Sequence, residues 1–224
     1  MKAMDIMVRD VVTIGPEADV ADAIKLLVEH DISALPVVDA DGGVIGVISE
    51  ADLVRRTEPG AEPQRPWWLE ALTPASTLAA EFAKAHGRRV SEVMSRNVIS
   101  APEDATLGEI ASLLEKHRIK RVPILRDGQL VGVVSRSNLI QALASAPANG
   151  AAPATSDRTI RLELLDRLGD QDWTDFGSRN VIVSSGVVHL WGLVGSEAER
   201  KALIALAEEV PGVVRVADEM IPAY

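Results

Sequence analysis

The hydrophobic positions of this chain follow one pattern twice. Residues 44–53 (VIGVISEADL) and 130–139 (LVGVVSRSNL) each place apolar side chains around a glycine, followed by a serine, a polar side chain and a leucine. The similarity extends over residues 7–56 and 94–143, which align almost end to end. A pattern of this length that occurs twice indicates a duplicated unit of domain size rather than a solenoid of short repeats.

Each copy predicts the same order of elements. A short strand (11–14 in the first copy, 98–100 in the second) precedes an amphipathic helix, whose apolar side chains recur every three or four residues. These side chains are Val20, Ala23, Ile24 and Leu27 in the first copy and Leu107, Ile110, Leu113 and Leu114 in the second. An apolar run, a turn and another strand follow, and a second helix begins at Ser49 or Ser135. The order β-α-β-β-α leaves one sheet face uncovered, so we expect two copies to pack together.

The repeated unit resembles the CBS domain, and the tandem copies resemble the paired arrangement known as the Bateman module. The resemblance rests on LPVVD, VPIL and the pattern Gly-x-x-[Ser/Thr]-x-x-[Asp/Asn], at 35–39, 122–125, 46–52 and 132–138. It implies two β-α-β-β-α repeats packed as a pseudo-twofold pair. Residues 2–6 and 89–93 predict the same lead-in helix ahead of each first strand, which would make the first repeat complete at its N-terminus.

The last part of the chain has a different pattern. It predicts a helix at 160–168, two strands joined by Ser184-Ser185-Gly186, a helix that begins at Ser196 and a last strand at 213–220. Residues 186–203 and 212–216 resemble the BON domain. The expected fold class is therefore α+β, with two CBS-type repeats and a small αββαβ BON-like domain.

Five segments follow from these patterns. They are a first CBS repeat at 1–56, an insertion at 57–88, a second CBS repeat at 89–143, a linker at 144–157 and a BON-like domain at 158–224. The insertion holds Trp67 and Trp68 and predicts a helix at about 76–86; it either packs on the CBS-like module or forms a partner or dimer surface. The linker consists of small residues, and as a flexible coil it would span roughly 20 Å, so we expect the tail to be a separate unit near the module.

Composition excludes several classes of protein. The chain has no cysteine, so disulfides and thiolate metal sites are excluded. A net charge of −10 disfavours binding to nucleic acid. No apolar stretch has the length of a membrane span or a signal peptide, so we expect a cytoplasmic protein.

The two serine motifs are the main candidates for binding chemistry. In the CBS family the serine contacts phosphate and the acidic residue bonds ribose hydroxyls, which suits a helix N-terminus where free N–H groups favour an anion. Asp52 would accept hydrogen bonds from two hydroxyls, and Asn138 would do so as a neutral partner. The alternative is structural, because Ser-x-x-Asp at a helix start also resembles a capping box.

The resemblance implies a set of nucleotide-contacting residues in each repeat. In the first repeat these are Thr13, Ile14, Ile32, Ser33, Ala34, Pro36, Ser49 and Asp52. In the second repeat they are Ser100, Ala101, Ile119, Lys120, Arg121, Pro123, Ser135, Arg136 and Asn138. Adenine would lie against the isoleucines, Ala101 and the prolines, with backbone groups at Thr13 or Ser100 reading its edge. The cations belong to the second repeat, so we expect the phosphates to lie near them.

Catalysis finds little support in the sequence. His30 and His117 occupy equivalent positions near helix ends, which favours a structural role, and no nucleophile, P-loop or metal motif appears. In the BON-like segment, His189 and Trp191 share a strand face that either contacts phospholipid or protein or is covered within the fold. We therefore expect a regulatory homodimer that binds an adenine nucleotide and needs no cofactor. The alternative is an adaptor whose CBS pair is structural and whose BON-like domain binds lipid or protein.

Overall fold

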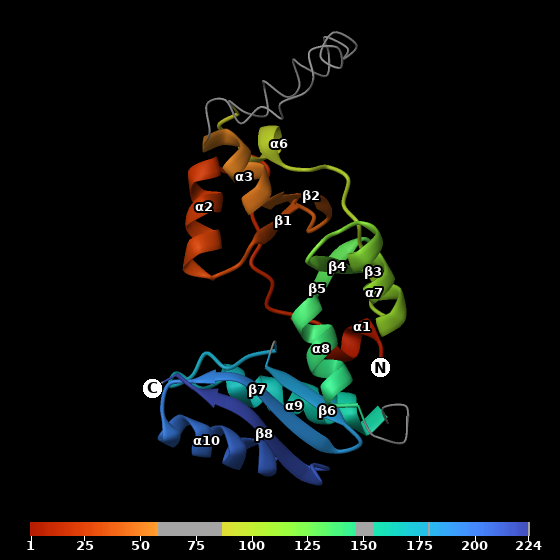
Figure 1. Ribbon diagram of the computed structural model, residues 1–224, viewed down its shortest axis with the longest axis vertical. Helices are drawn as coiled ribbons and strands as arrows, with labels where there is room; N and C mark the ends of the chain where they lie inside the picture. Colours follow the sequence, from red (N-terminus) through yellow and green to blue (C-terminus); the bar gives the residue numbers. More distant parts are fainter. Residues whose placement is uncertain (58–86, 147–154, 179, 224) are drawn as a thin grey trace. The chain divides into compact units, whose positions relative to one another are not determined.

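The structure is a computed structural model that describes residues 1–57, 87–146, 155–178 and 180–223. The chain divides into two compact units (Figure 1). One comprises Val12–Val98 and Asp127–Leu130, and the other comprises Met1–Val11, Ile99–Arg126 and Val131–Tyr224. The helix predicted in the insertion lies outside the described residues, and so do Trp67 and Trp68.

The first unit contains the first repeat. Strands β1 (Ala34–Val38) and β2 (Val44–Ser49) pair antiparallel, and helices α2 (Val20–Glu29) and α3 (Glu50–Thr57) follow the predicted order. Leu35, Val37 and Ile48 are fully buried in its core. The predicted first strand at 11–14 is reduced to one parallel bridge, between Ile14 and Val37. Ile24 was expected in the core but is 47% exposed.

The second unit contains the second repeat, whose sheet has the order β3-β4-β5. Its strands are β3 (Ala101–Pro102), β4 (Arg121–Arg126) and β5 (Gln129–Ser135), and its helices are α7 (Leu107–Lys116) and α8 (Arg136–Ala144). The prediction of a strand at 98–100 is wrong, because the strand is two residues long and begins at Ala101. Ile110, Val122, Ile124 and Val134 are fully buried between the sheet and the helices.

The two lead-in helices exist, but each belongs with the other repeat. Helix α1 (Ala3–Ile6) contributes Ala3 and Ile6 to the core of the second repeat, and Val8 forms an antiparallel bridge with Val133. Helix α6 (Val90–Val93) contributes its two valines to the core of the first repeat. Each lead-in helix thus completes the core of the other repeat rather than the core of the repeat that it precedes.

The C-terminal domain is a three-stranded sheet with two helices on one face. Strands β6 (Val181–Ser184), β7 (Val187–Val194) and β8 (Arg215–Pro222) lie in that order, and α9 (Thr155–Gly169) and α10 (Glu197–Glu208) share a core with their inner face. Helix α9 begins inside the predicted linker and is longer than the predicted helix. The β6–β7 turn places Ser185 and Gly186 at positive φ, as a two-residue hairpin requires.

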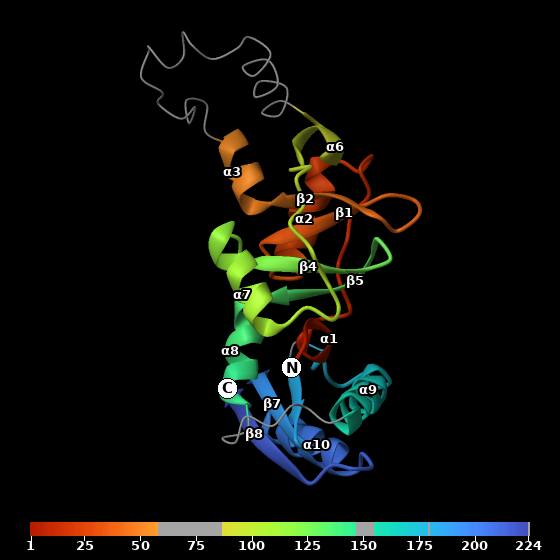
Figure 2. The same ribbon diagram turned by 90° about the vertical axis from the view of Figure 1, so that its right-hand side faces the viewer.

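The other face of this sheet packs on the second repeat. Ile182 is 2% exposed and belongs to the same core cluster as Ile6, Met7 and Val134, and Trp191 packs against that cluster. The C-terminal end of α8 reaches strand β7 (Figure 2). The tail thus shares a core with the second repeat, whereas we expected a separate unit, because its sheet presents apolar side chains on both faces.

Candidate functional site

The first candidate motif lies where β2 ends and α3 begins. The Asp52 carboxylate accepts hydrogen bonds from the backbone N–H of Ser49 (3.1 Å) and from its hydroxyl (2.7 Å). Its other oxygen accepts from the hydroxyl of Ser95 (3.1 Å). The carboxylate is therefore held over the first turn of α3, where its negative charge interacts favourably with the helix dipole.

The second motif has the same geometry at the start of α8. Asn138 accepts from the N–H (2.9 Å) and the hydroxyl (2.7 Å) of Ser135, and the N–H of Asn138 donates back to that hydroxyl (3.3 Å). Asn138 is only 4% exposed. The capping box that the sequence allowed as an alternative is thus present at this helix. A ribose hydroxyl would have to share Asn138 with Ser135 or displace that bond.

Of the residues expected around the first motif, Ser33 and Ala34 contact its backbone, and the others lie elsewhere in the first repeat. Ala34 is the cross-strand partner of Ser49. The carbonyl of Ser33 accepts from the N–H of Glu50 (3.1 Å), which joins this loop to the start of α3. Ile14 donates its N–H to the carbonyl of Pro36 (3.1 Å). Thr13 precedes this bridge, and Ile32 packs against the core of the first repeat.

The expected residues of the second repeat gather in two places. Lys120 and Arg136 lie together, because the N–H of Arg136 donates to the carbonyl of Lys120 (3.2 Å). Both side chains are exposed, and Arg121 is half-buried. Ala101 pairs with Ile124, next to Pro123, and Ile119 packs against the core of the second repeat.

Ser100 and Ala101 line an open cleft of about 690 Å³ beside α7. The remaining lining residues come from the end of β3, the segment after it and one side of α7, and include Thr106, Glu109 and Ser112. Sequence reasoning missed these three, since polar side chains on an amphipathic helix are expected to face solvent. Glu109 accepts hydrogen bonds from both the N–H and the hydroxyl of Thr106, and the two residues form a capping box at the start of α7.

Sequence reasoning also missed Ser95, which bonds Asp52. The alignment of the two copies places Val8 opposite Ser95, so the pattern gave no sign of a polar role. The two motifs therefore differ in their surroundings: Asp52 has a second hydroxyl beside it, and Asn138 is buried behind its own cap.

Comparison with known proteins shows the family. The CBS domain model matches residues 3–58 and 90–145, which make up half of the chain. The chain belongs to the CBS domain family. The BON domain model matches residues 156–221, so the two CBS repeats are followed by a C-terminal BON domain.

Relatives share the CBS pair. Uncharacterized protein MJ1426 of Methanocaldococcus jannaschii is 34% identical over 154 residues, which cover 64% of this chain and 91% of that protein. CBS domain-containing protein CBSX1 of Arabidopsis thaliana is 28% identical over 142 residues, 59% of each chain. An inosine-5'-monophosphate dehydrogenase of Thermoplasma acidophilum is 32% identical over 136 residues, but these are only 22% of its length. The match to that enzyme therefore concerns its CBS part and carries no activity to this chain.

Among solved structures, CBSX2 in complex with AMP is similar to this CBS pair. It has a TM-score of 0.50 and 26% sequence identity, and the match covers 64% of this chain and 96% of that one. The AMP in that structure is bound by CBSX2.

The remaining titratable groups fit structural roles. His30 and His117 are the C-cap residues of α2 and α7, as expected from their positions near helix ends. Within the described residues, no cluster of three or more His, Asp or Glu side chains could hold a metal ion. None of the helices in this part of the chain has the length and apolar character that crossing a membrane requires.

Proposed function

We propose that this protein is a non-enzymatic regulatory protein whose CBS pair binds an adenine nucleotide. The observation that carries the proposal is the doubled motif, in which Ser49 with Asp52 and Ser135 with Asn138 stand at helix N-termini in one geometry. A helix N-terminus favours phosphate, and a carboxylate or amide one turn further can accept from ribose hydroxyls. The AMP complex of CBSX2 supports this ligand class.

The two repeats offer different groups for such a ligand. Asp52 carries the charge suited to ribose, while Lys120 and Arg136 are exposed and suited to phosphate. We propose that the adenine ring lies against Ile14, Ile32 and Pro36, or against their counterparts Ala101, Ile119 and Pro123.

Titration calorimetry with AMP, ADP, ATP, an NAD form and S-adenosylmethionine tests this proposal. Binding of at least one of them, weakened by Asp52→Ala or Asn138→Ala, would support it. Ser196→Ala is the matched control, because Ser196 caps α10 of the BON domain through Glu199 (3.1 Å) and belongs to neither motif. Absence of heat and of thermal stabilisation with all five ligands would refute the proposal.

We propose further that the protein forms a homodimer and is cytoplasmic. Apolar side chains are left exposed on helices of both repeats, among them Val28 (76%) on α2 and Leu143 (72%) on α8. Such faces are typical of subunit contacts. Light scattering after chromatography measures the assembly, and Val28→Asp or Leu143→Asp should shift it towards the monomer. A monomer in the unsubstituted protein would end this proposal.

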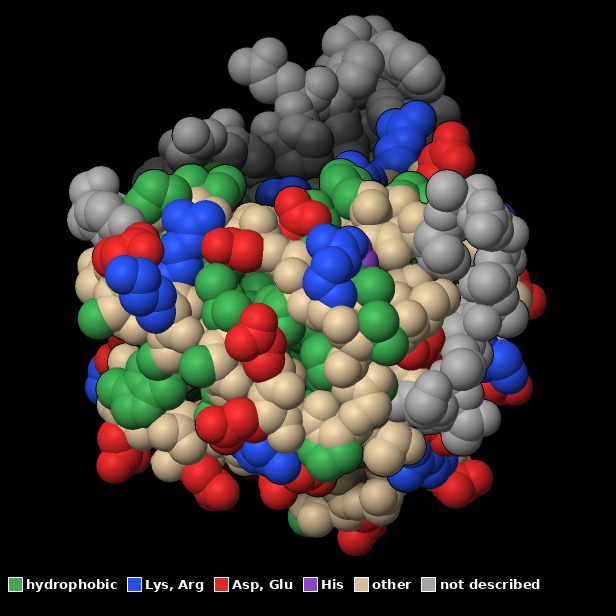
Figure 3. Space-filling view, turned by 90° about the horizontal axis from the view of Figure 1, so that it is seen from below, with side chains coloured by type: hydrophobic (Ala, Val, Ile, Leu, Met, Phe, Trp, Pro, Cys, Tyr) green, Lys and Arg blue, Asp and Glu red, His purple; other side chains and the backbone are tan. Residues whose placement is uncertain are grey.

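The adaptor alternative must use a different BON surface from the one expected. Trp191 packs against the second repeat and donates its indole N–H to the hydroxyl of Ser145 (3.2 Å). Side chains at the outer end of the sheet, Leu193 (67%) and Ile221 (60%), remain exposed. Seen from below, over the BON domain, acidic, basic and apolar side chains are interspersed rather than gathered into a basic patch (Figure 3). This arrangement favours a protein partner over an anionic lipid surface.

A further inference from the structure

Helix α8 of the second repeat is held at both ends. Its N-terminus carries the capping box of Ser135 and Asn138, and Ser145 directly follows its last turn. The hydroxyl of Ser145, a residue 3% exposed, accepts the indole N–H of Trp191 from the BON domain. The helix therefore connects a candidate nucleotide motif to the BON sheet over its own length.

A second connection runs through the lead-in segment. Arg161 on α9 is 3% exposed and donates to the carbonyl of Met7 (3.1 Å). It also donates to the carbonyls of Ser178 (2.7 Å) and Val181 (2.9 Å) within the BON domain. A buried guanidinium that bonds three carbonyls is costly to expose or misplace, so it fixes these segments relative to one another. Burial lowers the pKa of Arg161 to about 10, which leaves the side chain charged at neutral pH.

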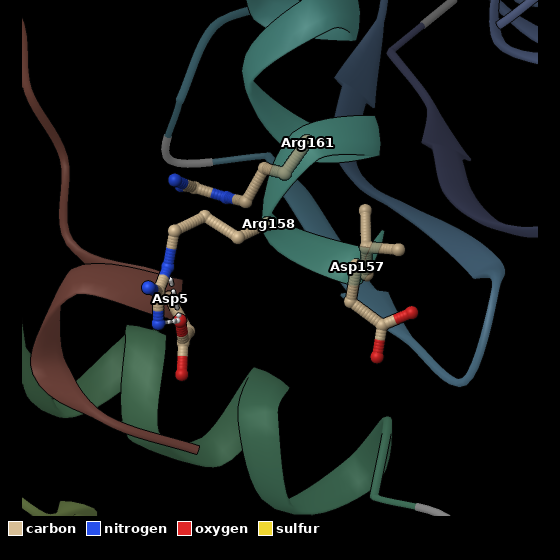
Figure 4. Close-up of a pocket in the computed structure, with 5 residues that line it drawn as sticks. Asp5, Asp157, Arg158 and Arg161 are labelled. Carbon is tan, nitrogen blue, oxygen red and sulfur yellow. Dashed lines mark hydrogen bonds and ion pairs between the residues drawn. The ribbon is translucent and has the colours of Figure 1, made fainter. Parts of the chain in front are cut away.

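Neighbouring contacts reinforce this connection. Arg158, one turn before Arg161, forms an ion pair with Asp5 of α1 (2.7 Å), and Figure 4 shows its guanidinium directed at that carboxylate. The N–H of Arg9 donates to the hydroxyl of Ser178 (3.2 Å). The cavity between Asp5, Asp157 and the two arginines has a volume of about 10 Å³, which is room for about one water molecule.

The lead-in in turn contacts the strand that ends at the second motif. Val8 and Val133 exchange two backbone hydrogen bonds of 2.9 Å. The side chain of Met7 lies against Gly132, where an added Cβ would meet its sulfur at 2.6 Å. Gly132 opens the Gly-x-x-Ser-x-x-Asn pattern, and β5 ends three residues later at Ser135.

We infer that the BON domain is a clamp on the second CBS repeat, with Arg161 and Trp191 fixing the position of β5 and α8 and thus of the motif between them. A change at the motif moves the BON domain, and release of the BON domain loosens the motif. The use of the clamp as a regulatory link rests on the proposed nucleotide binding. The clamp itself can be measured without ligand.

Amide hydrogen exchange of the full chain tests the clamp. In Arg161→Met, which keeps an apolar chain in the buried position but removes the three donors, exchange at Val8 and Val133 should rise about tenfold or more. Exchange at the backbone amide of Asn138, which donates to the hydroxyl of Ser135, should also rise. Arg200→Met is the matched control, because Arg200 pairs with Asp218 within the BON domain and neither residue belongs to the junction. It should leave these three amides unchanged.

Trp191→Phe provides a second, milder variant. It keeps an aromatic ring on β7 and removes the indole N–H that donates to the hydroxyl of Ser145, together with part of the indole ring system. Exchange at the Ser145 amide, which bonds the carbonyl of Gln141 (2.9 Å), should rise a few-fold. If either variant speeds exchange within the BON sheet but leaves Val8, Val133 and Ser145 at their original rates, the BON domain does not fix the position of β5 and α8. The clamp is then refuted. A failure of nucleotide binding would refute the proposed function and leave these rates unaffected.

Discussion

At the scale of single residues, the glycines of the two motifs have a packing role beside their place in the pattern. Gly132 faces Met7 and Gly46 faces Met94, so each glycine makes room for a methionine of a lead-in segment. The carbonyl of Val8 lies 2.9 Å from where a Cβ on Gly132 would stand. A backbone atom cannot move aside as a flexible side chain can, so these positions resist any side chain.

Substitution of these glycines should therefore destabilise the protein. Gly132→Ala is expected to lower the free energy of unfolding by about 1–3 kcal/mol through overpacking. Gly108→Ala is the control with the opposite sign. Nothing lies within 4 Å of its added methyl group, and alanine in a helix is about 0.5–1 kcal/mol better than glycine. Denaturant titrations measure both, and equal effects of the two substitutions would contradict the packing argument.

A second residue-scale feature is the half-buried imidazole of His189 on the BON sheet. Its side chain is 13% exposed and lies 3.6 Å from Glu219. Burial lowers the pKa of His189, and this outweighs the opposite effect of Glu219. The folded state then binds fewer protons than the unfolded state between the lowered pKa and the ordinary value of 6.5, so stability falls as pH drops below 6.5.

This sign can be checked by thermal unfolding between about pH 5 and 7, within the range where an unperturbed histidine titrates. The melting temperature should fall towards pH 5, and His189→Gln should flatten this part of the curve. Glu103 and Glu109 have pKa values lowered from 4.5, so their effect on stability appears at more acidic pH. A slope that His189→Gln leaves intact would show that another group is responsible.

At the scale of elements, helix starts are where structure and candidate function overlap. Ser135 and Ser196 both cap a helix, by accepting the N–H of Asn138 and of Glu199. The Ser-x-x-polar spacing predicts a helix start at Ser196 and allows a cap at Ser135 as the alternative to phosphate binding. It could not decide whether Ser135 serves the helix alone, because the geometry of a cap and that of a phosphate site share the same free N–H groups.

Paired alanine substitutions separate the two roles. Ser135→Ala and Ser196→Ala should each lower the free energy of unfolding by about 1 kcal/mol through loss of the cap. Only Ser135→Ala should also reduce the thermal shift that a nucleotide produces. Equal thermal shifts in both variants would leave Ser135 as a cap without a role in binding.

Much of the element order was accessible from the sequence, and the reasons are physical. Apolar spacing gave α2, α7 and the strands around Pro36 and Pro123, because burial on one face dictates periodicity. The very short β3 was misplaced, since two paired residues carry no period. The candidate residues near Ser49 and near Arg136 could be grouped by resemblance, but Ser95 could not, because it comes from a lead-in that packs across the repeat boundary.

At the scale of the whole molecule, the BON domain and the second repeat share a core. Ile182 leaves this core if the BON domain is removed, and the face that covered it becomes exposed. Burial of one such side chain is worth about 1.5–3 kcal/mol. The sequence could not reveal this contact, because a sheet face that is partly apolar has the same residue pattern whether it is exposed to solvent or packed against another domain.

A chain that ends before residue 155 should therefore be less stable in its second repeat. Its melting temperature is expected to fall by about 3–12 °C, at 2–4 °C per kcal/mol for a chain of this size. Scanning calorimetry of the full and shortened chains makes the comparison. An unchanged transition for the second repeat would show that the docked sheet adds nothing to its stability.

The exchanged lead-in helices have a consequence for how the molecule can be divided. A break between residues 58 and 86 produces an N-terminal piece that carries Ala3 and Ile6, and a C-terminal piece that carries Val90 and Val93. Each piece then carries the lead-in helix whose apolar side chains complete the core of the other piece. The two halves, when co-expressed, should consequently co-purify as a reconstituted protein. Recovery of two independent, folded halves would show that the exchanged lead-in helices are dispensable.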